Sequence, residues 1–207
     1  MALIMIYGCQ NKETYTLKDT YTDKPAYGDM LIDSSIGEPA ILNPVLASDS
    51  ASAEINDLVF SGLVKFDKNL NLTGDLAEKW EIKDGGLIII FYLKKNVKWH
   101  DGAPFTAKDV KFTYDIYMAP ETKTAYRSLF EPVKNVIVID DYTVKVNYKK
   151  PFAPALQYWG TGILPSHLLE GKDINTAVFN RAPVGTGPYT FKNWKTGRSV
   201  ELMANKD

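Results

Sequence analysis

The sequence has 207 residues, with 24 lysines and arginines against 25 aspartates and glutamates, and a formal net charge of −1. Hydrophobic residues make up 45% and charged residues 24%, the profile of a globular protein rather than a disordered or fibrous one. A charge balance this even offers no basic face for nucleic acid. One cysteine and two histidines exclude an internal disulfide framework and a multi-cysteine zinc site. We therefore expect no nucleic-acid partner, no bound metal and no cofactor.

The N-terminus places a short apolar run directly before the single cysteine, Cys9. Residues 10–28 are polar and cannot bury enough apolar surface to order themselves, so we expect a flexible tether. This arrangement is typical of the end of a bacterial lipoprotein signal, in which the cysteine carries the lipid. Because the basic segment and the longer apolar run of a complete signal are absent, we interpret residues 1–28 as a signal remnant and tether. The alternative is an ordinary disordered start with a chance cysteine.

Periodicity and turn residues predict the regular elements that follow. In chain order they are a strand at 30–34, a loop at 37–44, a helix from about 53 that stops at Gly62, an extended piece at 64–72, a hairpin at 81–93, a helix at 106–118, a hairpin at 133–148, short helical turns at 151–159 and 165–169, an irregular segment at 181–188, and strands at 189–191 and 199–203. Helices mixed with antiparallel hairpins predict an α+β (mixed α/β) fold.

Two of these elements carry specific local signals. Thr106 is a natural N-cap, and Asp109 follows three residues later in a variant of the capping box. The hairpin at 81–93 turns at residues 84–86, Asp-Gly-Gly, which tolerate positive φ. Its second arm, residues 87–93, is apolar on both faces, so we expect it to be a central strand.

Several segments follow one another in a fixed order along the chain. They are Glu38-Pro-x-x-Leu-x-Pro44, Gly62-Leu-Val-Lys-Phe-Asp67, Leu76-Ala-Glu-Lys-Trp80, Val97-Lys-Trp-His-Asp-Gly-x-Pro104, Phe105-Thr-Ala-Lys-Asp-Val110, Val184-Gly-Thr-Gly-Pro-Tyr189 and Asn205. Together they resemble the family 5 extracellular solute-binding proteins, which are the dipeptide, oligopeptide and nickel receptors of ATP-binding-cassette (ABC) importers.

The resemblance implies the N-terminal part of a type II periplasmic-binding-protein-like clamp with two lobes. Residues 29–50 and 178–207 would form part of a discontinuous main domain, residues 51–177 would be an inserted α+β domain, and the opposing lobe would lie outside the sequence. The implied function is the capture of di- or oligopeptides for an ABC permease, by a monomeric, lipid-anchored receptor in the periplasm or on the extracellular face of the cell membrane. A nickel chelate or haem is the alternative cargo, and a truncated domain that binds nothing is a third reading.

Five residues are candidates for contact with the ligand. Glu38 and Pro39 lie in the loop after the first expected strand, where open α/β sheets place ligand-contacting groups. Glu38 would either pair with the ammonium group of a peptide or cap the next helix. The resemblance implies that Tyr126, Trp159 and Thr161 lie in segments that approach the cleft, and aromatic rings suit ligands of varied chemistry. The alternative is that both rings belong to the core.

No catalytic residue is expected, so we predict a binding protein rather than an enzyme. His100 and Asp101 are adjacent, and neighbours on a strand point to opposite faces, so they cannot act as a supported base. The glycines of residues 185–188 lack the Lys-Ser/Thr ending of a phosphate loop. We expect them where the chain crosses back between domains and a side chain would clash.

Overall fold

The computed structural model describes residues 30–206, and the chain divides into two compact units, residues 1–34 and 35–207. In the first unit, residues 30–34 have no regular secondary structure, so the predicted strand is wrong. Its apolar side chains are exposed, and no described strand pairs with it. Apolar character alone does not make a strand without a hydrogen-bonded neighbour. Cys9 and the expected signal remnant and tether lie outside the described residues.

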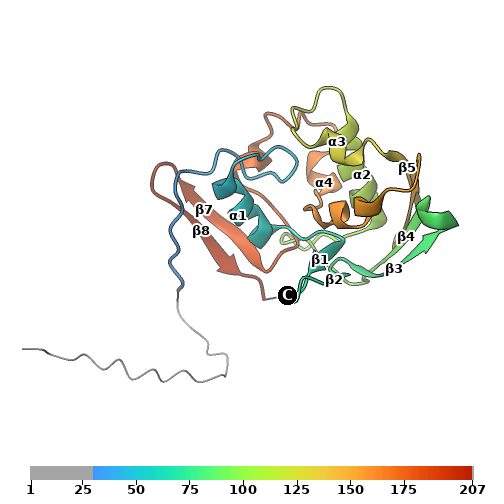
Figure 1. The fold of residues 1–207 in the computed structure, drawn as a ribbon. Coiled ribbons are helices and arrows are strands. Elements are labelled where there is room, and N and C mark those ends of the chain that lie inside the picture. Colours follow the sequence, from blue (N-terminus) through green and yellow to red (C-terminus); the bar gives the residue numbers. More distant parts are fainter. Residues whose placement is uncertain (1–29, 207) are drawn as a thin grey trace, which may run out of the picture. The chain divides into compact units, whose positions relative to one another are not determined.

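The second unit, residues 35–207, combines helices with antiparallel strands and confirms the α+β prediction (Figure 1). Its elements are α1 (Ser50–Val59), β1 (Val64–Phe66), β2 (Leu72–Gly74), β3 (Ala77–Lys83), β4 (Ile88–Leu93), α2 (Ala107–Met118), α3 (Arg127–Phe130), β5 (Val133–Asp140), β6 (Thr143–Tyr148), α4 (Ser166–Leu169), β7 (Tyr189–Lys195) and β8 (Ser199–Ala204). Short 3-10 turns lie at Asp84–Gly86, Ala153–Ala155, Gln157–Gly160 and Val178–Arg181. Among the described residues, no helix has the length and apolar character needed to cross a membrane.

A four-stranded antiparallel sheet has the order β3-β4-β6-β5, so β4 is a central strand as predicted. Burial alternates along β4 and β6, and one face carries the fully buried side chains Phe91, Val144 and Val146. Registered pairs such as Phe91 with Val144 place these side chains opposite one another. Cross-strand contacts of this kind stabilise a sheet when one face is buried.

Helix α2 packs against β5 and β6 and also contacts α3 and α4 (Figure 1). The predicted capping box begins it: the backbone N–H of Thr106 donates to Asp109 Oδ2 at 2.9 Å. Val110 and Tyr117 are buried on the face toward the sheet. The local cap and the apolar face therefore fix both the start of the helix and its orientation.

Helix α1 packs against β7 of the two-stranded β7–β8 hairpin (Figure 1). Asp49 caps its start by accepting from the Ser52 backbone N–H at 2.8 Å. The helix ends at Val59 rather than at Gly62, which corrects the predicted stop. A Cβ atom on Gly62 would lie 2.5 Å from the backbone of Gly160, so this glycine permits two chain segments to touch.

One continuous hydrophobic core joins the end of α1 to the sheet. It includes Val59, Leu63, Phe91, Phe130 and Trp159. The expected division into a main domain (29–50 with 178–207) and an inserted domain (51–177) stays a prediction. Residues 35–207 form one compact unit. Helix α1, which the expected boundary assigns to the inserted domain, packs against β7.

Candidate ligand groove

An open groove of about 790 Å³ lies in the second unit. It gathers segments that are far apart in the sequence: the end of the loop before α1, the end of α1, the β1–β2 hairpin, the turn at 157–162 and the crossover at 186–188. The lining residues are Pro44, Asn56, Asp57, Phe60, Ser61, Gly62, Val64, Lys65, Phe66, Leu72, Asp75, Gln157, Gly160, Gly162, Thr186, Gly187, Pro188 and Asn205. Ligand pockets in proteins commonly have volumes of this order.

The wall formed by residues 185–187 passes in direct contact with the C-terminal end of α1. The Gly187 N–H donates to the Val59 carbonyl at 2.8 Å. A Cβ atom on Gly185 would lie 1.8 Å from the same carbonyl oxygen, so no side chain fits there. The predicted reason for these glycines, a close approach that excludes side chains, is confirmed, whereas the reading of this segment as a crossing between domains stays a prediction.

Two buried polar groups at the groove have no hydrogen-bond partner among the described residues. Asn56 is 4% exposed, and neither its Nδ2 nor its Oδ1 atom is paired; the hydroxyl of Thr186 is also unpaired. A buried polar group left unpaired costs about 1–3 kcal/mol. Beside Asn56, burial raises the pKa of the Asp57 carboxyl above its ordinary value. The groove therefore holds unused hydrogen-bonding capacity.

The sequence carries a signal for Asn56 in the spacing of the polar residues of α1. Ser52 and Asn56 are four residues apart and lie on the buried face of α1. Residues at this spacing share one face of a helix. Polar residues on a buried helix face require partners, and Ser52 has them: its hydroxyl accepts from the Ala40 and Ile41 backbone N–H groups. Asn56 is the residue on this face that has none.

His100 ties the loop before α2 to the groove wall by three hydrogen bonds. Its backbone N–H donates to the Gly185 carbonyl at 2.9 Å, and its Nδ1 atom accepts from the Gly185 N–H at 3.2 Å. Its Nε2 atom donates to the Gly187 carbonyl at 2.9 Å. A carbonyl oxygen only accepts, so the proton of the neutral ring is on Nε2. Burial lowers the pKa of His100, although the Gly187 carbonyl and the charge of Asp101 act in the opposite direction.

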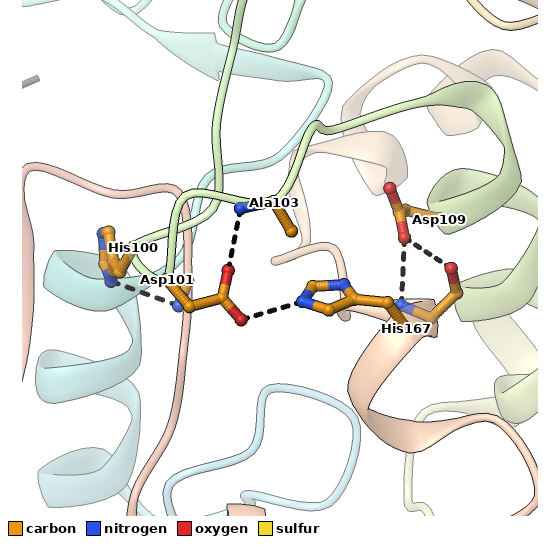
Figure 2. A network of polar contacts seen from close by, with 7 residues as sticks. His100, Asp101, Ala103, Asp109 and His167 are labelled. Atoms are coloured by element: carbon orange, nitrogen blue, oxygen red, sulfur yellow. Dashed lines mark hydrogen bonds and ion pairs between the residues drawn. The ribbon is translucent and has the colours of Figure 1, made fainter.

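A second polar group lies on the other side of this loop (Figure 2). Asp101 accepts from His167 Nε2 at 2.8 Å and from the Ala103 N–H at 3.1 Å. Asp109 accepts from both the N–H and the hydroxyl of Ser166, at 2.9 and 2.7 Å. The Ser166 hydroxyl thus donates to a carboxylate and not to an imidazole. In the part of the chain that the structure describes, these groups do not form a nucleophile with its base.

His100 and Asp101 lie in a turn, which corrects the assumption that they sit on a strand. The conclusion that they do not support each other is unchanged, because each side chain bonds elsewhere: His100 to residues 185–187 and Asp101 to His167. Within the described range 30–206, no group of three or more His, Cys, Asp or Glu side chains is placed to hold a metal ion.

Glu38 lies beside a tryptophan and an arginine that the sequence prediction missed. The indole Nε1–H of Trp194 donates to Glu38 Oε1 at 3.0 Å, and the Arg181 guanidinium lies 3.3 Å from the centre of the Trp194 ring. The alternative that Glu38 caps the next helix is wrong, because Asp49 caps α1. Glu38 remains exposed and its neighbour Pro39 is half-buried, so both are accessible at the surface.

The other three predicted residues lie in or against the core. Trp159 is 1% exposed, its Nε1–H donates to the Tyr148 hydroxyl at 3.0 Å, and its ring packs against Phe91 and Phe130. The expectation that Trp159 lines a cleft is therefore corrected: its ring is a core ring, as the alternative held. Tyr126 is half-buried: part of its side chain packs against the same core, and the rest is accessible.

Thr161 lies between two glycines of the groove and shares a hydrogen bond of 2.8 Å with the Tyr117 hydroxyl. Burial raises the pKa of Tyr117, the bond to Thr161 lowers it, and nearby Tyr126 raises it further. None of the five predicted contact residues lines the groove directly; Thr161 comes nearest to it in sequence, between Gly160 and Gly162.

The chain matches the model of the bacterial extracellular solute-binding proteins, family 5 Middle, over residues 71–207. It is 40% identical over 192 residues to the oligopeptide-binding protein AppA of Bacillus subtilis, which is 89% of this chain and 35% of the relative. The solved structure of that AppA in complex with a nonapeptide has a TM-score of 0.79 and 38% identity, over 83% of this chain and 35% of the AppA chain.

NikZ from Campylobacter jejuni, solved in complex with Ni(L-His), has a TM-score of 0.77 and 40% identity, over 82% of this chain and 34% of its own. The chain thus spans about a third of the length of these relatives. The family match covers well over half of the chain, and the structural similarity to AppA covers a larger share of it, 83%. The chain belongs to the family 5 bacterial extracellular solute-binding proteins.

Proposed function

We propose that this chain supplies one wall of the ligand cleft of a receptor that captures peptides outside the cytoplasmic membrane for an ABC importer. Family membership and the likeness to AppA, which is named as oligopeptide-binding and was solved with a nonapeptide, support the class of ligand. The observation that carries the proposal is the unpaired carboxamide of buried Asn56 at the groove.

The chemistry of Asn56 matches the chemistry of a peptide group. A carboxamide offers N–H donors and a carbonyl acceptor, and a peptide group offers one of each, so the two can pair at two points. Thr186 adds a hydroxyl that both donates and accepts. A ligand read through its main chain leaves its side chains free to vary, as a receptor for mixed peptides requires. Small adjustments of the groove wall would bring these buried atoms into reach.

We propose additional ligand contacts at Glu38 and Pro39. Tyr126 and Thr161 are proposed as further contacts, in the two segments that are expected to approach the cleft. The Glu38 carboxylate is exposed, and the Trp194 indole orients it by a hydrogen bond. An oriented carboxylate at a surface is suited to bind the ammonium end of a peptide. Trp159 would contribute indirectly, because its buried ring supports the turn at 157–162 that carries Thr161.

The anchoring and location of the protein are part of the same proposal. Cys9 would carry a lipid and hold a monomeric receptor at the outer face of the membrane, in the periplasm or at the cell surface. Mass spectrometry of the native protein tests this step: we expect a lipid-modified cysteine at the mature N-terminus, and an unmodified Cys9 would contradict it.

A nickel chelate is the second candidate cargo, because NikZ is as similar in sequence as AppA. In the described residues, however, both ring nitrogens of His100 are hydrogen-bonded and His167 is bonded to Asp101. His100 therefore offers no free ring nitrogen to a metal, and His167 is not among the residues that line the groove, so the peptide is preferred.

Isothermal titration calorimetry with a mixture of unrelated peptides, and separately with the nickel–histidine complex, tests the proposal. We expect heat of binding with peptides, and we expect Asn56→Ala to weaken it by about tenfold, the effect of one lost hydrogen bond. Asn69→Ala, an exposed site outside the groove, is the matched control and should bind as the unaltered protein does. Binding of the nickel complex without binding of peptides would favour the second candidate, and equal binding by both variants would remove Asn56 from the site.

A further inference from the structure

The three hydrogen bonds of His100 end on a wall of the groove and not in the body of the protein. Thr186 and Gly187 line the groove, and the residues that His100 binds, Gly185 and Gly187, flank Thr186 on both sides. A side chain that holds both flanks of Thr186 also determines where its unpaired hydroxyl lies.

We propose that His100 is a positioning residue for the groove: its neutral ring holds the Gly185–Gly187 wall, and protonation of the ring loosens this wall at the Gly185 amide and weakens ligand binding in acid. The inference rests on the proposed function of the groove for its effect on ligand. The hold on the wall itself is independent of any ligand.

The hydrogen-bond pattern requires the neutral ring. Nδ1 of His100 accepts from the Gly185 N–H, and Nε2 donates to the Gly187 carbonyl. The imidazolium form donates from both nitrogens and accepts at neither. After protonation, the Nδ1–H group and the Gly185 N–H group face each other as two donors, and the Gly185 amide loses its acceptor. The bonds from Nε2 to the Gly187 carbonyl and from the His100 backbone N–H to the Gly185 carbonyl remain, so the wall loses one of its three bonds to His100, the one at the Gly185 amide.

The groups around the ring act on its protonation in opposite directions. Asp101 is the neighbouring charge that favours the protonated ring, while burial opposes it and leaves the pKa of His100 below its ordinary value. The crossover at 184–188 carries no ionisable side chain. On α1, Glu54 and Asp57 form no hydrogen bond or ion pair with the ring in the described residues. His167 forms no hydrogen bond with the His100 ring in the part of the chain that the structure describes; its own hydrogen bond is to Asp101.

The sign of the effect follows from the lowered pKa. The neutral ring is the form that the folded wall prefers, so the contribution of His100 to stability is complete above the ordinary pKa of histidine. It is lost as the pH falls through the lower pKa of the folded protein.

Amide exchange of Gly185, followed by nuclear magnetic resonance between about pH 7 and about pH 5, tests the hold directly and without ligand. After correction for the intrinsic pH dependence of exchange, we expect the protection of the Gly185 amide to fall in parallel with the titration of the His100 ring. His100→Gln keeps a donor and an acceptor but does not titrate, so its Gly185 protection should not follow pH. His167→Gln is the matched control and should retain the change seen in the unaltered protein. Gly185 protection that ignores the His100 titration would overturn the inference, even if the variant failed to fold.

Calorimetry with the peptide mixture then tests the effect on the groove. We expect the unaltered protein to lose roughly tenfold in affinity over the same pH range, the effect of one lost hydrogen bond, and His100→Gln to lose much less. Equal losses in both proteins would overturn the link to ligand binding. If no peptide binds at any pH, the proposed function fails, while the Gly185 measurement still decides whether His100 holds the wall.

Discussion

The four-stranded sheet and the β7–β8 hairpin are both antiparallel, but they differ in how completely they are covered. In β4 and β6 every second side chain is fully buried, whereas no side chain of β7 or β8 is. The sheet has α2 packed against β5 and β6, while the hairpin has α1 packed against β7. The sheet therefore has a fully buried face within this chain, whereas the hairpin is covered less completely, by α1 and by contacts such as those of Trp194 with Glu38 and Arg181.

This difference indicates which region contributes more to the free energy of unfolding of the chain. Burial of apolar area is the main favourable term in folding, so the region with the buried strands should dominate the free energy of unfolding. Substitutions of comparable residues in the two regions measure the difference directly; three such comparisons follow, and a prediction on pH comes after them.

A tryptophan pair gives the largest expected effect. Trp159 lies in the core behind the sheet, and Trp194 lies half-exposed on β7. We expect Trp159→Ala to reduce the free energy of unfolding by about 3–5 kcal/mol, because it leaves a large cavity and removes the indole donor to the Tyr148 hydroxyl, which keeps only its bond to the Ala155 carbonyl. Urea denaturation measures the loss. Trp194→Ala is the control and should cost less than half as much; equal losses would mean that the hairpin is as well packed as the sheet.

A pair of acidic residues gives the next largest effect. Asp109 on α2 is 2% exposed and accepts from Thr106 and twice from Ser166, whereas Glu201 on β8 forms exposed ion pairs with Lys192 and Lys195. Asp109→Ala should cost about 2–3 kcal/mol, since three donors lose a charged acceptor. Glu201→Ala should cost less than about 1 kcal/mol. Thermal unfolding of both variants checks the order, and a larger effect at Glu201 would contradict it.

For cation–π contacts we expect the larger effect at the hairpin and not at the sheet, because the shorter of the two compared contacts involves the hairpin. Arg181 lies 3.3 Å from the ring centre of Trp194, and Lys79 lies 5.0 Å from that of Tyr92 in the sheet. We expect Arg181→Ala to cost about 1 kcal/mol and Lys79→Ala about 0.5 kcal/mol or less. Urea titrations monitored by tryptophan fluorescence separate the two, and a spectral change confined to Arg181→Ala would locate the contact. The same cost at both positions would mean that distance does not decide the effect.

The smallest effect concerns pH. Burial would raise the pKa of Asp101, but hydrogen bonds from His167 and Ala103 outweigh it and hold the pKa below its ordinary value. The stabilisation by Asp101 is therefore present above the ordinary pKa of aspartate and is lost as the pH falls through the lower folded value. His167→Ala should flatten the acid side of the stability–pH curve slightly. An unchanged curve would show that the His167 bond does not act on Asp101.

The elements of the sheet and of α2 could be predicted because their signals are local. The capping box at Thr106 and Asp109, the turn at Asp84–Gly86 and the apolar run into β4 each lie within a few residues. The family resemblance was also readable from the sequence, and the family match confirms it. The strand predicted at 30–34 failed because pairing depends on a partner strand, which no local pattern supplies.

The groove could not be predicted for the same reason. Asn56, Thr186 and His100 come from three separate stretches of sequence, and their relation depends on how α1, the crossover and the loop before α2 pack. The family resemblance and the glycines beside Trp159 favour a position that lines the cleft, yet the Tyr148 hydroxyl and two aromatic rings enclose its ring. Aromatic residues beside glycines are compatible with both positions, and only the packing decides between them.

Strand β5 has one further consequence, for the behaviour of the protein in concentrated solution. It is an edge strand, and Ile137, Val138 and Ile139 are 42%, 38% and 54% exposed. An apolar edge invites strand addition by another molecule. The register of β5 against β6 shifts near both ends, and such irregularities twist an edge away from regular pairing. We therefore expect slow self-association on storage at high concentration, which light scattering would follow, instead of rapid precipitation.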